Sequence, residues 1–478
     1  MVIVLSLVSG LLAYASFAPL GYWWCAPFSL ALLIHLLNER SMRRRALAVM
    51  VFGASFFAPL LSWSNTYVGN VPWLILTVLQ ITMLLPLSLL PMSKLGNLYL
   101  FPSIWVTVEF LRGHFPFNGF GWGRIAFSQA SAPYALVAGI GGTPLLSFLV
   151  AIMALGIYFI FKLRLKIAAI VFISVFIFTT ITFATLPAMP RRDFPILAVQ
   201  GGVPSLGLDF NSRATVVFEN HLRASADYLK TEAFKPQVVL WPENSIDVDP
   251  FKNRKVRDQL NSLVDNFHTP FIVGAVLQHG SNFQNASILW EPRVGAASIY
   301  IKRHLTPFGE YIPLRAIAEF VSPFAANVVD FLPGERVIVH QVGRAKIAPI
   351  ICFELLDDAS GRVMARASNL FVVQTNSATF GISAESDQQL GITRIRAIEH
   401  RRYSISISTS GVSAIIDPRG RVTHKTGANQ RAIIDSVVGL NNSLSPADRY
   451  GSQIEFILIL FPPILVTFRG KRRREPSQ

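Results

Sequence analysis

The chain has 478 residues, of which 51% are hydrophobic and only 15% are charged, and its mean hydropathy is +0.44. This composition excludes an ordinary soluble globular protein, in which about a quarter of the residues carry a charge, and it indicates a membrane protein. The net charge of +15 does not indicate a nucleic-acid partner, because the basic residues gather in short clusters between long apolar segments.

Eight apolar segments are expected to form membrane helices, because each approaches the length of roughly 17 to 25 residues that crosses a bilayer. They lie near residues 2–19, 22–38, 46–63, 73–91, 98–112, 134–161, 167–186 and 454–468. When the helices are threaded in order, the basic clusters at 40–45, 94, 162–166 and 469–474 fall on one side, which the positive-inside rule makes the cytoplasm. The sequence therefore predicts a multi-pass protein of the cell membrane.

The stretch from 191 to 450 has a different character and is expected to lie outside the cell. It holds 28 Lys and Arg against 24 Asp and Glu, a surplus of only 28 − 24 = 4. Short apolar runs that are typical of strands, such as "FPILAVQ", "FIVGAVL" and "LFVVQTN", alternate with helical segments near 212–233, 252–267, 357–368 and 387–402. The pattern predicts a transmembrane helical domain over 1–190, an α/β catalytic domain over 191–450, and a last membrane helix with a basic tail over 451–478.

Three ionisable residues each follow one of the predicted strands directly. Glu243 follows "VVLWP", Lys302 follows "SIYI" and Cys352 follows "IAPII". Ligand sites of open α/β sheets collect beyond the strand ends, so these side chains could converge. A thiol is mostly protonated at neutral pH and needs a base or a nearby cation to act as a nucleophile. A glutamate and a lysine supply both, which favours an acyl-transfer site.

Each of these residues also has a structural interpretation that the pattern leaves open. The only other cysteine is Cys25, in the membrane part, so Cys352 is expected to be a free thiol, and a free cysteine is often a small buried hydrophobe. Glu243 could cap the turn after Pro242, and Lys302 could lie in an exposed turn. The occurrence of all three residues at strand ends favours the catalytic interpretation.

The motifs around these residues resemble the nitrilase superfamily. They are "LWPENS" around Glu243, "IKRHLTPFGEYIP" around Lys302 and Glu310, and "IICFE" around Cys352 and Glu354. With membrane helices on both sides, the whole chain resembles the apolipoprotein N-acyltransferase family, and "TNSATFG" resembles its actinobacterial branch. The resemblance implies an αββα sandwich joined to a multi-helix transmembrane domain.

Carried over residue by residue, the resemblance makes Glu243 the proton acceptor, Lys302 the group that stabilises the tetrahedral intermediate, and Cys352 the nucleophile. Glu310 and Glu354 match supporting acidic positions. Departures such as Phe353, where a tyrosine is frequent, leave these three residues in place.

The implied reaction moves a fatty acyl chain from a phospholipid to Cys352 and then to the α-amino group of a diacylglyceryl-cysteine on an apolipoprotein, without a metal or cofactor. The implied location is the bacterial plasma membrane, with the catalytic domain on the extracytoplasmic side. Two alternatives are a membrane-tethered nitrilase-type amidase and a membrane scaffold with an inactive nitrilase-like domain. The elaborate helical part argues against the first, and the presence of all three reactive residue types argues against the second.

Overall fold

The computed structural model describes residues 1–66, 69–89, 91–92, 95–203, 215–231, 233–316, 319 and 329–472, and side chains up to residue 460. Lys94, residues 212–214 of an expected helix and the end of the basic tail lie outside the described residues. The chain divides into two compact units. The first comprises Met1–Ser62, Trp73–Leu186 and Ser445–Gln478; the second comprises Trp63–Pro72 and Pro187–Leu444.

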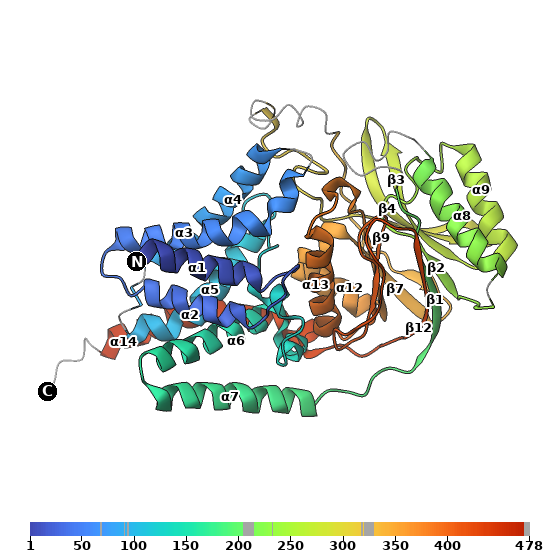
Figure 1. Cartoon of the computed structure of the whole chain (residues 1–478). Coiled ribbons are helices and arrows are strands. Elements are labelled where there is room, and N and C mark those ends of the chain that lie inside the picture. Colours follow the sequence, from blue (N-terminus) through green and yellow to red (C-terminus); the bar gives the residue numbers. More distant parts are fainter. Residues whose placement is uncertain are drawn as a thin grey trace. The chain divides into compact units, whose positions relative to one another are not determined.

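The first unit is helical and contains a helix at each of the eight predicted positions (Figure 1). These helices are α1 (Val2–Ala15), α2 (Cys25–Leu36), α3 (Met42–Leu60), α4 (Asn70–Leu84), α5 (Leu95–His114), α6 (Ala138–Phe161), α7 (Leu165–Ala184) and α14 (Pro446–Arg472). Among the residues that the structure describes, three helical segments are long and apolar enough to cross a membrane, namely Asn70–Leu89, Ala135–Phe161 and Leu165–Ala184.

Helices α1, α2 and α3 do not meet this criterion of length and apolar composition, because the first two are short and the third is charged at its start. At a rise of about 1.5 Å per residue, the 14 residues of α1 and the 12 of α2 cover only about 21 and 18 Å, against a hydrocarbon core of about 30 Å. Helix α3 begins with the basic run Arg43–Arg45. The chain is a membrane protein, and the full set of eight spans stays a prediction.

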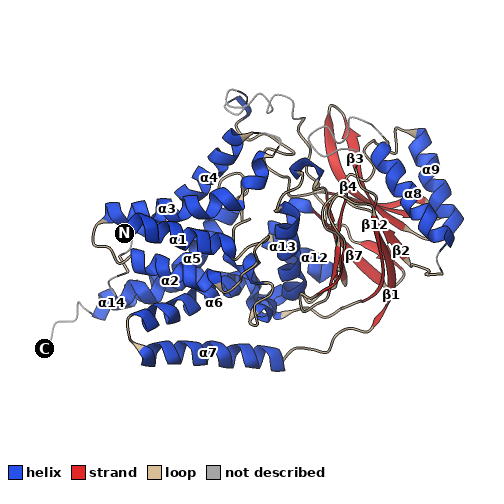
Figure 2. Cartoon of the chain, viewed as in Figure 1, coloured by secondary structure: helices blue, strands red, loops and turns tan. Residues whose placement is uncertain are grey.

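The second unit contains two six-stranded sheets (Figure 2). One has the order β12-β1-β2-β3-β4-β5, and its strands are β12 (Ala432–Gly439), β1 (Arg192–Gln200), β2 (Val238–Leu240), β3 (Phe271–His279), β4 (Asn282–Glu291) and β5 (Gly295–Ile301). The other has the order β11-β10-β9-β8-β7-β6, and its strands are β11 (Val422–Lys425), β10 (Ala414–Ile416), β9 (Ser404–Ser408), β8 (Leu370–Thr375), β7 (Ala345–Ile351) and β6 (His340–Val342). The central strands β1–β2–β3 and β7–β8–β9 pair in parallel, and the flanking strands pair antiparallel.

The alternation of side chains along β1 explains how the layers form. Ile196 and Ala198 belong to an apolar cluster that also holds Ile347, Val372 and other inward residues of the second sheet. Leu197 and Val199 point the other way, into a cluster under α8 (Val216–Thr231) and α9 (Arg254–Phe267). Because successive side chains of a strand alternate between faces, one sequence run fills both layers of the core.

Helices α12 (Asp358–Ala367) and α13 (Glu385–His400) contact the second sheet (Figure 1). Helix α12 begins where it does because the Asp357 side chain accepts hydrogen bonds from the backbone N–H groups of Ala359 and Ser360, at 2.9 and 3.0 Å. Helices thus cover both sheets, and the predicted αββα sandwich joined to a helical membrane part is confirmed.

Candidate active site

Cys352 stands at the end of β7, on the first residue of the short helix η5 (Cys352–Leu356). Its φ of 50° lies in the left-handed region, which is unusual for a residue with a side chain and is often found where a backbone holds a functional group in place. The thiol is free and half-buried. The sharp change of direction between strand and helix therefore presents the Sγ atom at the strand end.

Lys302 follows β5 and lies between two carboxylates. Its Nζ atom is 2.7 Å from Oε2 of Glu310 and 3.6 Å from Oε1 of Glu243, and its side chain is only 1% exposed. The backbone N–H of Thr306 also donates to Oε2 of Glu310, at 2.8 Å. Because a buried ammonium group is costly unless it is paired, this arrangement fixes the position of the lysine charge.

Asn285 on β4 joins the two carboxylates. Its Nδ2 group donates to Oε1 of Glu243 at 2.6 Å and to Oε1 of Glu310 at 3.0 Å. Its backbone C=O accepts the N–H of Lys302 at 2.8 Å, so one residue aligns both acids and the lysine. The sequence reasoning missed Asn285; the available signal was a polar residue directly before the apolar strand run "ASILW".

Glu354 lies behind the nucleophile and connects two loops. Its Oε1 atom accepts from Tyr300 Oη at 2.7 Å, from Arg303 N at 2.8 Å and from His304 N at 3.3 Å. Its Oε2 atom accepts from Ile351 N at 2.8 Å. The carboxylate therefore holds the chain just before Cys352 against the chain just after Lys302.

Two further polar groups approach the site from neighbouring segments. Gln389, on the first turns of α13, donates from Nε2 to the Sγ atom of Cys352 at 3.6 Å. The backbone N–H of Asn376, directly after β8, donates to the carboxylate of Glu243. The sequence reasoning missed both, because Asn376 acts through its backbone N–H and Gln389 lies on a helix, away from any strand end.

Burial and the lysine charge set the protonation of the acids. Burial raises the pKa of Glu243 to about 7, although Lys302 pulls it down. Burial also opposes ionisation of Glu310, but Lys302 outweighs it and holds the pKa of Glu310 below its ordinary value. Burial alone would lower the pKa of Lys302, yet the two carboxylates raise it above the usual value, so the lysine stays charged.

The thiol of Cys352 is protonated in the resting site. Burial, with the charge of Glu243 as the next cause, raises the pKa of Cys352 well above its ordinary value despite Lys302. A thiol in this state attacks only as its proton leaves, and Glu243, with a pKa near neutrality, is suited to accept that proton. The arrangement can therefore perform general-base-assisted nucleophilic chemistry at a carbonyl.

Of the five residues that the sequence singled out, four form one electrostatic group: Glu243, Lys302, Glu310 and Cys352. Glu354 is attached to this group from behind, through the backbone. Within the described ranges, no three His, Cys, Asp or Glu side chains are grouped so as to hold a metal ion.

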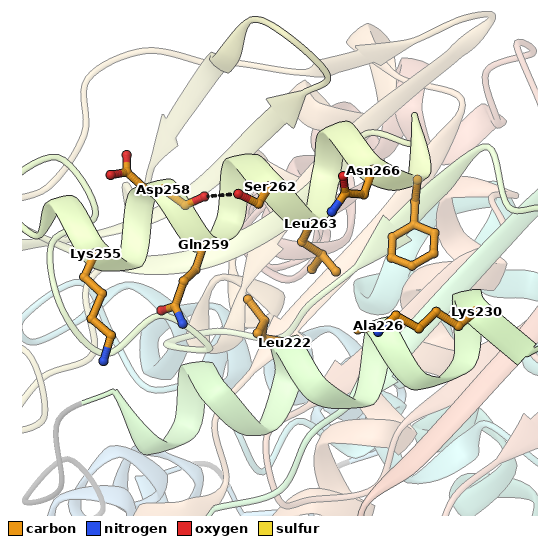
Figure 3. A pocket seen from close by; sticks show the side chains of 10 residues that line it. Leu222, Ala226, Lys230, Lys255, Asp258, Gln259, Ser262, Leu263 and Asn266 are labelled. Carbon is orange, nitrogen blue, oxygen red and sulfur yellow. Dashed lines mark hydrogen bonds between the residues drawn. The ribbon is translucent and has the colours of Figure 1, made fainter.

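A groove of about 790 Å³ lies elsewhere, between α8 and α9, and holds none of these residues. Figure 3 shows Leu222 of α8 and Leu263 of α9 in the groove, with Lys230 and Lys255 among the polar residues around them. The groove is lined by helices on the outer face of the first sheet, so the catalytic chemistry is not located there.

The comparisons with known proteins cover both units. Residues 9–156 match the apolipoprotein N-acyltransferase N-terminal domain, and residues 198–441 match the carbon-nitrogen hydrolase family. An apolipoprotein N-acyltransferase of Mycolicibacterium smegmatis is 31% identical over 94% of this chain and 82% of its own length. Another, of Geobacter metallireducens, is 25% identical over 98% of this chain and 95% of its own length.

Among solved structures, an amidase of the nitrilase superfamily from Nesterenkonia aligns with 56% of this chain and 98% of its own, with 15% identity and a TM-score of 0.41. Family matches over both units, together with a relative above 30% identity over most of both chains, are decisive. The chain belongs to the apolipoprotein N-acyltransferase family of membrane acyltransferases.

Proposed function

We propose that Cys352 carries the acyl chain in this acyltransferase and that Glu243 and Lys302 assist it in both half-reactions. The donor is a phospholipid, and the acceptor is the α-amino group of a diacylglyceryl-cysteine on an apolipoprotein. The observation that supports the proposal best is the buried cation of Lys302, held between Glu243 and Glu310 and in electrostatic contact with the Cys352 thiol.

In the first half-reaction, Glu243 takes the proton of the Cys352 thiol while Sγ attacks the ester carbonyl of the phospholipid. The carbonyl oxygen becomes an oxyanion that the Lys302 charge stabilises. The C–O bond of the ester then breaks, and the proton held by Glu243 passes to the leaving alkoxide. The products are a lysophospholipid and a thioester on Cys352.

In the second half-reaction, the neutral amine of the acceptor attacks the thioester carbonyl. A C–N bond forms, the same lysine stabilises the oxyanion, and the C–S bond breaks. Glu243 takes a proton from the nitrogen and returns it to the sulfur of Cys352. The enzyme is restored, and the acceptor carries an amide-linked acyl chain.

Both substrates are lipids, so the catalytic domain must work beside the membrane. We propose the division into a helical domain over 1–190, a catalytic domain over 191–450 and a last helix with a basic tail over 451–478. The basic clusters between the helices support a multi-pass topology with the catalytic domain on the extracytoplasmic side.

The test supplies purified protein in detergent with a phospholipid and a diacylated lipopeptide, and follows both by mass spectrometry. The wild type is expected to release lysophospholipid and to yield a lipopeptide heavier by one acyl chain, and Cys352→Ala is expected to do neither. Free fatty acid in place of acylated lipopeptide would point to the amidase-like alternative. An active Cys352→Ala variant would refute the mechanism.

A further inference from the structure

Helix α13 brings one more carboxyl group to the site. Glu385 is its first residue, and Gln389, one turn later on the same face of the helix, contacts the Cys352 sulfur at 3.6 Å. Glu385 is only 2% exposed, compared with 5% for Glu243 and 1% for Lys302. It is therefore as deeply placed as the groups proposed for catalysis.

The hydrogen bonding of Glu385 is incomplete. The Ser377 hydroxyl donates to the carboxyl group, while the buried Oε2 atom has no hydrogen-bond partner among the described residues. A buried polar atom without a partner is costly and is often kept for a function. One acceptor position of Glu385 is thus available to a donor that enters the site.

Ionisable groups on the surrounding elements lie near Glu385. Glu243, after β2, and Cys352, after β7, both interact electrostatically with it. Asp387, in the same turn of α13, is partly exposed and is paired with Lys425 at 2.9 Å. Burial raises the pKa of Glu385 to about 8, with Ser377 opposing and Glu243 reinforcing the shift.

The acceptor half-reaction has a proton requirement that the donor half-reaction lacks. A free α-amino group has a pKa of about 7.7 to 8.0, so the acceptor arrives largely as an ammonium ion, which has no lone pair for attack. One proton must leave before the C–N bond forms, and a second after it forms. Glu243 accounts for the second, because that proton returns to the sulfur of Cys352.

We propose that Glu385 is the second base of the site and that its Oε2 atom receives the first proton of the incoming ammonium ion. This inference rests on the proposed function. The ammonium N–H bond breaks, the proton moves to the carboxylate, and the nitrogen lone pair then attacks the thioester carbonyl. Glu385 later releases that proton to solvent. Its pKa is close to that of the amine, so the transfer is nearly balanced in free energy.

The test separates the two half-reactions in Glu385→Gln, which keeps the shape of the side chain. Acyl-enzyme formation, measured as lysophospholipid release in a single turnover, is expected to stay at the wild-type rate. Transfer from the isolated acyl-enzyme to the lipopeptide is expected to fall by about 10-fold at pH 7, because only about a tenth of an amine with a pKa of about 8 is neutral there without a base. The deficit is expected to shrink toward about pH 9, where the amine is neutral without a base.

Hydroxylamine supplies an internal control, because this amine is already neutral at neutral pH and attacks thioesters directly. Glu385→Gln acyl-enzyme is expected to react with it as fast as the wild-type acyl-enzyme does. Asp387→Asn, which removes a partly exposed carboxylate in the same turn, is expected to leave both half-reactions unchanged. Wild-type protein that transfers no acyl chain would refute the proposed function itself, independently of Glu385.

The inference is overturned if Glu385→Gln transfers at the wild-type rate, if both half-reactions slow equally, or if the deficit persists unchanged at high pH. Ser377→Ala gives a second readout should Glu385→Gln not fold. Ser377 lowers the pKa of Glu385, so its removal is expected to shift the rising limb of the transfer rate to higher pH. An unshifted profile contradicts the inference.

Discussion

The loss of stability on substituting Glu354 can be worked out from the hydrogen bonds that its carboxylate accepts. It lies two residues after the nucleophile and is buried, with an exposed fraction of 4%. Four donors share its two oxygens: Tyr300 Oη, Arg303 N and His304 N at Oε1, and Ile351 N at Oε2. Each substitution at this position leaves a countable number of those donors without an acceptor.

Glutamine keeps one oxygen, which can face the three donors at Oε1, but its amide group then faces the N–H of Ile351. One hydrogen bond to a charged acceptor is lost, at a cost of about 1.5 to 3 kcal/mol. Alanine leaves all four donors without their acceptor, at a cost of roughly 4 kcal/mol even at the lower limit of ~1 kcal/mol each. With about 2 to 4 °C per kcal/mol for a domain of this size, Glu354→Gln is expected to lower the melting temperature by about 3 to 12 °C, and Glu354→Ala by at least about 8 °C.

Thermal unfolding of the purified protein in detergent measures this effect, and single-turnover acyl-enzyme formation measures the effect on chemistry. Both variants are expected to acylate more slowly, since the carboxylate fixes the chain beside Lys302 and beside Cys352. Glu335→Ala, which removes an exposed carboxylate, is the control and is expected to match the wild type. A Glu354→Ala protein that melts within about 1 °C of the wild type would refute the reasoning.

Three further predictions follow from single contacts of the site. Acyl-enzyme formation is expected to rise with pH and level off above about pH 7, because Glu243 accepts the thiol proton only when ionised and its pKa is raised to about 7; a single-turnover rate that falls over this range would contradict its role as base. Gly274→Ala is expected to displace Glu243 and slow acylation, since the new methyl carbon would lie 2.3 Å from the carbonyl oxygen of Pro242 and 2.7 Å from Cα of Glu243; an unchanged acylation rate is the opposing result. Trp63→Ala removes a buried indole whose Nε1 donates to Gln388 at 3.2 Å, one residue before the glutamine that contacts the nucleophile; it is expected to destabilise the catalytic unit by about 3 to 5 kcal/mol and to slow acylation, with Trp63→Phe restoring most of the stability.

The strands that sequence reasoning missed share one property: they lie at sheet edges. Strands β6 and β11 end the second sheet, and β12 ends the first. Edge strands are often short and partly exposed, and β11, with its pattern "VTHK", has no fully buried residue. The pairing of β12 with β1 joins Arg192 to Gly439, and such a distant partner leaves no local signal in the sequence.

The site residues also divide into those that the sequence predicted and those that it did not. Glu243, Lys302 and Cys352 were predictable because each directly follows an apolar strand. Asn285 was not, because it meets Glu243 and Lys302 only through the antiparallel register that sets Ala286 opposite Ile301. The face of a helix that meets the site, as for Glu385, depends on tertiary packing, which a local pattern does not contain.

The position of the acyl group after incubation with phospholipid alone is the most direct test of the proposed mechanism. The chain has only two cysteines, Cys25 and Cys352, so peptide mapping by mass spectrometry assigns the adduct without ambiguity. The mechanism predicts one acyl chain on Cys352 in the wild type and in Cys25→Ser, and none in Cys352→Ser. An adduct on any other residue, or lysophospholipid release by Cys352→Ser at the wild-type rate, would contradict it.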